Sequence, residues 1–157
     1  MDILKENTAV LILVGICIIA AALYYVFQPA KSAEAADEQH VGSSSVGEVY
    51  VISSSVETVK KDGRYYLVAG VEERYTDQAL LADLQSSAAT KDAVAELCIY
   101  MFTSDGRYYC RPQRYLIDAQ GKVCTNLGSD MQLQMIDSAL ISDIYKTALK
   151  AAEKKLS

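Results

Sequence analysis

Near its start the chain carries nineteen consecutive residues without a charge, Ala9–Phe27. At about 1.5 Å per residue, a helix of this length spans nearly the whole ~30 Å hydrocarbon core of a bilayer. Tyr24 and Tyr25 stand near the end of the run, where aromatic side chains favour the membrane interface. The run therefore predicts a transmembrane helix, an uncleaved signal anchor that holds the protein in a cell membrane.

Two other interpretations of the N-terminus stay open. Residues 33–35 (Ala-Glu-Ala) would allow cleavage of a signal peptide before Ala36, although the apolar run exceeds the usual length of about 7–15 residues. Such cleavage would export the rest of the chain. A lipid anchor on Cys17 would need a small residue directly before the cysteine, and this chain has Ile16 there.

Composition divides the chain into four parts. Residues 1–8 are a short tail and residues 9–27 are the anchor. Residues 28–47 are small, polar and acidic, and they predict a flexible linker that contains His40, the only histidine. Residues 48–157 have the length of one domain with its own core.

Three turn signals organise this domain: Asp62-Gly63, Asp105-Gly106 and Gln120-Gly121. Asp-Gly between β-rich runs is typical of a hairpin, because glycine adopts positive φ without a steric penalty. The runs around the turns predict a mainly antiparallel sheet of about six strands. The predicted strands are Glu48–Ser53, Val56–Lys60, Arg64–Tyr75, Val94–Thr103, Arg107–Asp118 and Lys122–Leu127.

Two further segments predict helices. Thr76–Gln85 begins with an N-capping threonine and continues with apolar residues at helical spacing. Asp137–Leu156 carries an apolar stripe through Leu140, Ile144 and Ala148, and its last lysines favour the helix dipole. We expect this helix to pack on the sheet, which alone would bury too little apolar surface. The predicted fold class is α+β, with the transmembrane helix preceding the sheet.

The strand around Cys98 is apolar on both of its faces. We expect Leu97, Ile99 and Met101 to face the C-terminal helix, while the alternate residues face a second layer or an interface. Cys98 and Cys110 flank the second hairpin and are a candidate disulfide, which would require a register shift or a bulge. Three buried thiols, with Cys124 as the third, are the alternative.

The sequence contains no catalytic constellation, no cofactor motif and no metal-ligand pattern. The only histidine falls in the linker, so a nucleophile would lack the base that usually activates it. Arg107, Arg111 and Arg114 form a mild basic patch near the second hairpin. Arg107 and Arg111 share a predicted strand face and are a candidate contact for an anionic partner, with a solvated strand face as the alternative.

Several short motifs follow one another along the domain. A strand of the form Val49-Tyr50-Val51 is followed by a cysteine-containing hairpin, a Tyr-rich strand entering the turn at residues 118–123, and the helix start at residues 136–138. In these features the chain, from Glu48 to about Leu149, resembles the surface-adhesin protein E-like families of bacteria. The resemblance implies a small exported binding domain with no known catalytic centre. It carries over no binding residue.

Together these features predict a non-catalytic, adhesin-like binding or envelope-structural domain that meets a protein, envelope or host ligand. Lys5 and Lys31 flank the anchor evenly, and the short N-terminal tail favours a domain outside the cytoplasm. Since no run of Lys or Arg is present, nucleic acid is not an expected partner. One alternative is a single-pass subunit of a membrane-associated secretion or transfer complex, and another is an enzyme that uses carboxylates or a thiol.

Overall fold

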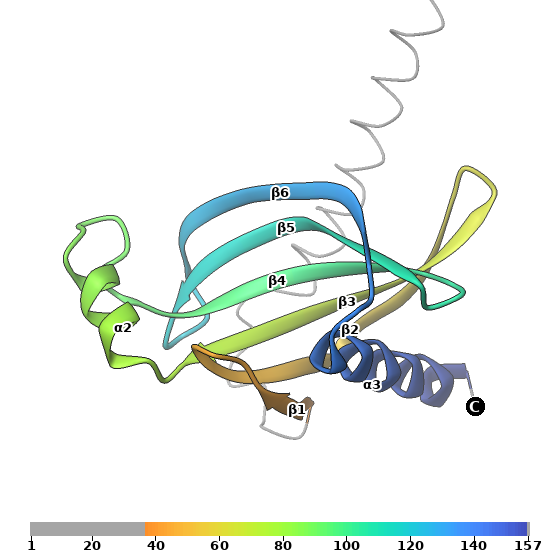
Figure 1. Cartoon of the computed structure of the whole chain (residues 1–157), viewed down its shortest axis with the longest axis horizontal. Coiled ribbons are helices and arrows are strands. Elements are labelled where there is room, and N and C mark those ends of the chain that lie inside the picture. Colours follow the sequence, from red (N-terminus) through yellow and green to blue (C-terminus); the bar gives the residue numbers. More distant parts are fainter. Residues whose placement is uncertain (1–36, 157) are drawn as a thin grey trace, which may run out of the picture. The chain divides into compact units, whose positions relative to one another are not determined.

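The computed structural model describes residues 37–156 (Figure 1). In chain order its elements are β1 (Glu38–Ser43), β2 (Gly47–Lys61), β3 (Arg64–Tyr75), α2 (Gln78–Gln85), β4 (Ala93–Thr103), β5 (Tyr108–Asp118), β6 (Val123–Met135) and α3 (Ala139–Leu156). The predicted anchor and the predicted cleavage site lie outside the described residues. Neither helix within residues 37–156 combines the length and the apolar character needed to cross a membrane.

The six strands form one antiparallel sheet in the order β1-β2-β3-β4-β5-β6, so each strand pairs with its neighbours in sequence. All three predicted turns connect adjacent strands. Gly63, Gly106 and Gly121 have φ values of 76°, 66° and 77° in these turns, a region that only glycine enters without strain. The antiparallel sheet of the predicted α+β fold and its C-terminal helix are thereby confirmed.

The first two strands differ from the prediction. Glu48–Ser53 and Val56–Lys60 belong to one long strand, β2, whose pairing with β3 is interrupted between Ile52 and Glu57. The buried Ser55 side chain satisfies the backbone at this bulge. Its hydroxyl donates to the Ile52 carbonyl at 2.6 Å and accepts from the Gly70 N–H at 2.8 Å.

Strand β1 lies inside the stretch predicted as a linker, so the prediction of a flexible linker is wrong for Glu38–Ser43. The glycine and serines of this region favour turns as local sequence. Pairing with β2 overrides that preference, because strand formation depends more on cross-strand neighbours than on intrinsic propensity. An ion pair between Glu38 and Arg74 of β3 adds a contact across β2.

Helix α3 packs on β1, β2 and β3 and covers one half of the sheet face that we call the inner face (Figure 1). Its buried residues Ile144, Ala148 and Ala151 join a core with side chains from β2, β3 and β4. The Tyr145 ring lies edge-on to Phe102 of β4, with centroids 5.4 Å apart. The inner face of β5 and β6 lies beyond the helix.

Strand β4 is apolar on both faces, but the predicted facing is reversed. Phe102 belongs to the core beneath α3, and Cys98 shares its face, because alternate residues of a strand point the same way. Leu97, Ile99 and Met101 lie on the opposite, outer face and are also buried. A period of two reveals two faces without saying which of them meets a helix. Here the aromatic contact with α3 selects the face of Phe102.

Candidate functional site

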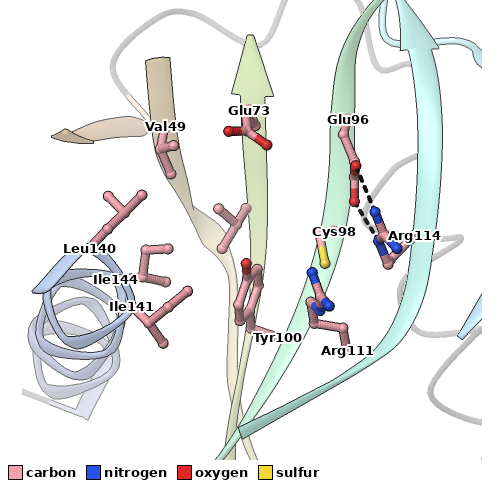
Figure 2. Close-up of a pocket in the computed structure, with 11 residues that line it drawn as sticks. Val49, Glu73, Glu96, Cys98, Tyr100, Arg111, Arg114, Leu140, Ile141 and Ile144 are labelled. Atoms are coloured by element: carbon pink, nitrogen blue, oxygen red, sulfur yellow. Dashed lines mark hydrogen bonds and ion pairs between the residues drawn. The ribbon is translucent and has the colours of Figure 1, made fainter. Parts of the chain in front are cut away.

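A cavity of about 120 Å³ lies where α3 ends its cover of the inner face (Figure 2). Its two walls differ in character. The wall next to α3 is apolar and consists of Val49, Val71, Leu140, Ile141 and Ile144. The wall on the sheet side is polar and consists of Glu73, Glu96, Cys98, Tyr100, Arg111 and Arg114.

The sheet register places these polar residues in rows across three strands. Glu73 of β3 lies opposite Glu96 of β4, and Cys98 of β4 lies opposite Arg114 of β5. Directly opposed residues on adjacent antiparallel strands point to the same face. The charged side chains therefore converge although they are far apart in sequence.

Arg114 and Glu96 form a two-pronged ion pair. Nε of Arg114 donates to Oε1 of Glu96 at 2.6 Å, and Nη2 donates to Oε2 at 3.1 Å (Figure 2). This geometry is the strong, directional form of the Arg–carboxylate contact. The hydrogen bonds from Arg114 to Glu96 raise the pKa of Arg114 above its ordinary value. Each of these two charges therefore already has its partner within the protein.

The hydrogen bonds of the Arg111 guanidinium group are incomplete. Its Nη2 contacts Oδ2 of Asp130 on β6 at 3.3 Å, and Gln134 donates to the same oxygen at 2.5 Å. The Nε atom of Arg111 is buried and has no hydrogen-bond partner among the described residues. A buried donor without an acceptor costs about 1–3 kcal/mol. Arg111 thus lines the cavity with a guanidinium group that has one buried donor without a partner.

Glu73 is the complementary case. Its carboxylate lines the cavity, and no hydrogen bond or ion pair joins it to another residue of the described part of the chain. Figure 2 shows Glu73 and Arg111 at different ends of the polar wall. The cavity therefore offers one anionic and one cationic group whose interactions are incomplete, next to an apolar wall.

Cys98 lies between these charges, and its chemistry is suppressed. Burial, reinforced by the nearby Glu96 carboxylate, raises the pKa of the Cys98 thiol to about 12. Burial also raises the pKa of Tyr100. At neutral pH both groups are protonated, and a protonated thiol is a poor nucleophile.

Arg107 and Arg111, which were predicted to contact an anionic partner together, do not lie in one site. Arg111 lines the cavity, whereas Arg107 lies in the turn before β5 with 77% of its side chain exposed. Its nearest carboxylate is Asp105, with Nε and Oδ2 3.9 Å apart. Only Arg111 of the predicted pair belongs to the site.

The predicted Cys98–Cys110 disulfide is not formed, and both residues are free cysteines. Cys98 lies opposite Arg114 on the inner face, whereas Cys110 lies opposite Met101, an outer-face residue. A disulfide requires Cβ atoms that point toward each other, and these two point to opposite sides of the sheet. The alternative of three buried thiols is right for Cys98 and Cys110 and wrong for Cys124, which is only partly buried.

Sequence reasoning missed Glu73 and Glu96 as site residues and placed Arg114 only in a general patch. Residues 111 and 114 are an odd number of positions apart, so a regular strand would send them to opposite faces. Pairing of β5 with β6 is irregular between these two positions, and the bulge there brings both guanidinium groups to the cavity. Pro112, which cannot donate to a sheet ladder, is the signal that could have indicated a bulge.

Comparison with known proteins adds no relative. No protein-family model matches the chain, no curated protein matches it, and no solved structure matches its fold.

Proposed function

We propose that this chain is a membrane-tethered, extracytoplasmic and non-catalytic binding domain, of the adhesin-like or envelope-structural kind. The observation that supports the proposal is the cavity beside α3, with its apolar wall and its two incompletely paired charges. Pockets with an apolar lining and a few oriented polar groups are the usual form of a small-molecule site. The tether itself rests on the apolar segment at residues 9–27.

The charges favour a particular class of ligand. Arg111 offers a guanidinium group with an incomplete set of hydrogen bonds to a carboxylate, and Glu73 offers a carboxylate to an ammonium group. Apolar side chains of α3 stand opposite these charges. A small zwitterion with an apolar substituent, such as an amino acid or the end of a short peptide, meets all three requirements.

Binding is a better use of this cavity than catalysis. Its thiol and its phenol are held in their protonated forms by burial. The only histidine of the chain, His40, contacts Glu48 at 2.6 Å and does not line the cavity. The Arg114–Glu96 pair stabilises a fixed wall, which suits recognition of a ligand by shape and charge.

Isothermal titration of the full chain in detergent micelles tests this proposal. The probes are L-alanine, N-acetyl-L-alanine, which lacks the ammonium group, and L-alaninamide, which lacks the carboxylate. We expect L-alanine to bind more tightly than either derivative. Arg111→Met should weaken L-alanine binding by about tenfold or more, equivalent to about 1.4 kcal/mol.

Arg107→Met is the matched control, because Arg107 lies on the same hairpin but outside the cavity. It should leave the affinity unchanged. Equal binding of all three probes, or an equal loss of affinity in both arginine variants, would contradict the proposed ligand class.

A second candidate function is that of a single-pass subunit in a membrane-associated secretion or transfer complex. The observation that favours it is the group of exposed apolar side chains on the edge strand β6. Crosslinking from Cys17 in intact membranes would separate the two functions. A discrete adduct with a different protein would support the complex subunit, and reaction with lipid alone would argue against it.

A further inference from the structure

Two hairpin turns carry the same five-residue motif, and the fold brings both to one end of the sheet. Residues 62–66 and residues 105–109 each read Asp-Gly-Arg-Tyr-Tyr. The first copy joins β2 to β3, and the second joins β4 to β5. Tyr66 of β3 pairs with Thr103 of β4, so the two turns project from adjacent strand ends. We call this end of the sheet, with residues 60–66 and 103–109, the hairpin end (Figure 1).

Each copy of the motif leaves one tyrosine ring exposed. Tyr65 is exposed by 54% and Tyr108 by 41%. Tyr65 shares its face with Leu67 of the inner core, whereas Tyr108 points away from that core, because its neighbour Tyr109 packs against it. The two exposed rings therefore lie on opposite faces of the sheet. A flat surface that meets the sheet end-on can touch both rings, which a ligand on one face cannot do.

The first turn is cationic. It has Lys60, Lys61 and Arg64 against the single carboxylate of Asp62. Nζ of Lys60 lies 5.4 Å from the centroid of the Tyr65 ring, so a cation and an exposed ring are held together. Lysine, arginine and tyrosine place their apolar parts against lipid and their polar ends in the headgroup layer. This combination suits the surface of a membrane.

The two ends of the sheet differ in charge. Within residues 60–66 and 103–109, four cationic side chains stand against two carboxylates. At the opposite end, within residues 76–92 and 118–122, four aspartates stand against two lysines. Since the whole chain has a net charge of −5, the hairpin end is a cationic region of an acidic protein. An anionic surface would attract this end and repel the other.

The start of β1 is directed toward the hairpin end. β1 runs antiparallel to β2, so its first residue is the one nearest the first turn. Asp37, just before β1, accepts the Ser53 N–H with its carbonyl at 2.9 Å. From Ser53 to Lys61, β2 covers about 26 Å. Residues 28–36, between the predicted anchor and Asp37, span at most about 30–32 Å. A tether of this length keeps the hairpin end within reach of the membrane surface.

We propose that the hairpin end contacts the phosphate headgroups of the membrane that holds the anchor. Lys60, Lys61 and Arg64 meet the phosphates, and the rings of Tyr65 and Tyr108 lie among the headgroups. The occupant is a lipid surface because the exposed rings lie on two faces, because this end is cationic, and because the tether is short. The inference rests on the tether of the proposed function and is independent of the ligand in the cavity.

Quenching of a fluorescent label by a nitroxide on the lipid headgroups tests this contact. The full chain, with Cys17→Ser and Cys124→Ser, is reconstituted in phosphatidylglycerol vesicles, and the two remaining cysteines are buried. The label is attached to Ser104→Cys in the second turn or to Gln120→Cys in the turn at the opposite end, both exposed positions. We expect the label at Ser104→Cys to be quenched at least about fivefold more strongly, since even one cation near an anionic surface favours contact by about this factor.

Two matched double variants separate this contact from a general effect of charge. Lys60→Gln/Arg64→Gln removes two cations from the hairpin end, and Lys91→Gln/Lys122→Gln removes two from the opposite end. All four side chains are exposed, so the fold should tolerate both variants. We expect only the first to reduce the quenching at Ser104→Cys. Phosphatidylcholine vesicles, which carry no net charge, should reduce it as well.

Flotation of the labelled chain with the vesicles separates failure of the contact from failure of the tether. A chain that floats while its labels at Ser104→Cys and Gln120→Cys are equally quenched would overturn the membrane contact alone. Equal loss of quenching in the two double variants would overturn it too. A chain that does not float would contradict the tether, and the contact with it.

Discussion

The inner face of the sheet has two halves that lie mainly on different strands and are satisfied in different ways. Under α3, Val51, Ala69 and Phe102 pack into a continuous apolar core with Ile144. Beyond α3, the same face carries the Arg114–Glu96 pair and the Arg111–Asp130 pair. The cavity lies at the boundary, where the apolar wall of one half meets the charges of the other.

This difference arises because a single helix cannot cover the whole inner face of a six-stranded sheet. α3 packs mainly on β1, β2 and β3. The side chains on the inner face of β5 and β6 therefore need partners other than the helix. Cross-strand ion pairs supply them, because partly exposed charges keep access to water. One half therefore contributes to stability through burial, and the other presents charged side chains beside the cavity.

The largest expected effect lies under the helix. Ile144 is 1% exposed in the core, and Ile144→Ala should lower the free energy of unfolding by about 2–5 kcal/mol through lost burial and a residual cavity. Leu149→Ala on the exposed side of the same helix should change it by less than about 0.5 kcal/mol. Urea denaturation of both variants measures the two values. Similar losses in both would show that α3 is not oriented as described.

A smaller effect is expected in the charged half. Arg114→Met leaves the Glu96 carboxylate, whose side chain is 12% exposed, without its partner and should cost about 1–3 kcal/mol. The double variant Arg114→Met/Glu96→Gln removes both charges and should be less destabilised than the sum of its single changes. Arg107→Met, with its distant and exposed carboxylate, is the control and should cost almost nothing. Strict additivity in the double variant would contradict the pairing.

The smallest effect at moderate pH comes from Cys98, where the halves meet. The pKa of its thiol is raised from 9.0 to about 12, so the folded protein holds this proton more tightly than the unfolded chain. The stabilising contribution is complete below about pH 9 and is lost as the pH rises toward 12. At pH 10 the loss should be about 1 kcal/mol. Denaturation at pH 8 and pH 10 should show a smaller decline for Cys98→Ala, and an identical decline would contradict burial of the thiol.

Local signals predicted much of the fold. The three glycine turns and the apolar stripe of α3 depend on residues close in sequence, and each appears where it was expected, within two residues for the start of α3. The cap of α2 is Asp77, whose side chain accepts the Leu80 N–H at 2.9 Å, one residue after the predicted Thr76. Turn and cap chemistry is local, which is why sequence alone locates it.

The rest depends on contacts between distant residues. β1 exists because β2 pairs with it, although its own composition favours a linker. The cavity forms because a bulge in β5 turns Arg111 and Arg114 to one face and because β4 supplies Glu96. Neither the bulge nor the facing of β4 follows from alternation of residue types, so the candidate site could be predicted only through Arg111.

The most direct test of the binding site is the Nε–H resonance of Arg111 in a ¹⁵N spectrum of the chain during titration with L-alanine. The account predicts a saturable shift of the Arg111 signal, assigned through its loss in Arg111→Met, while the Arg107 signal stays in place. It also predicts that Glu73→Gln weakens the response. An Arg111 signal that does not move, or that moves together with Arg107, would contradict the claim that this cavity is a binding site.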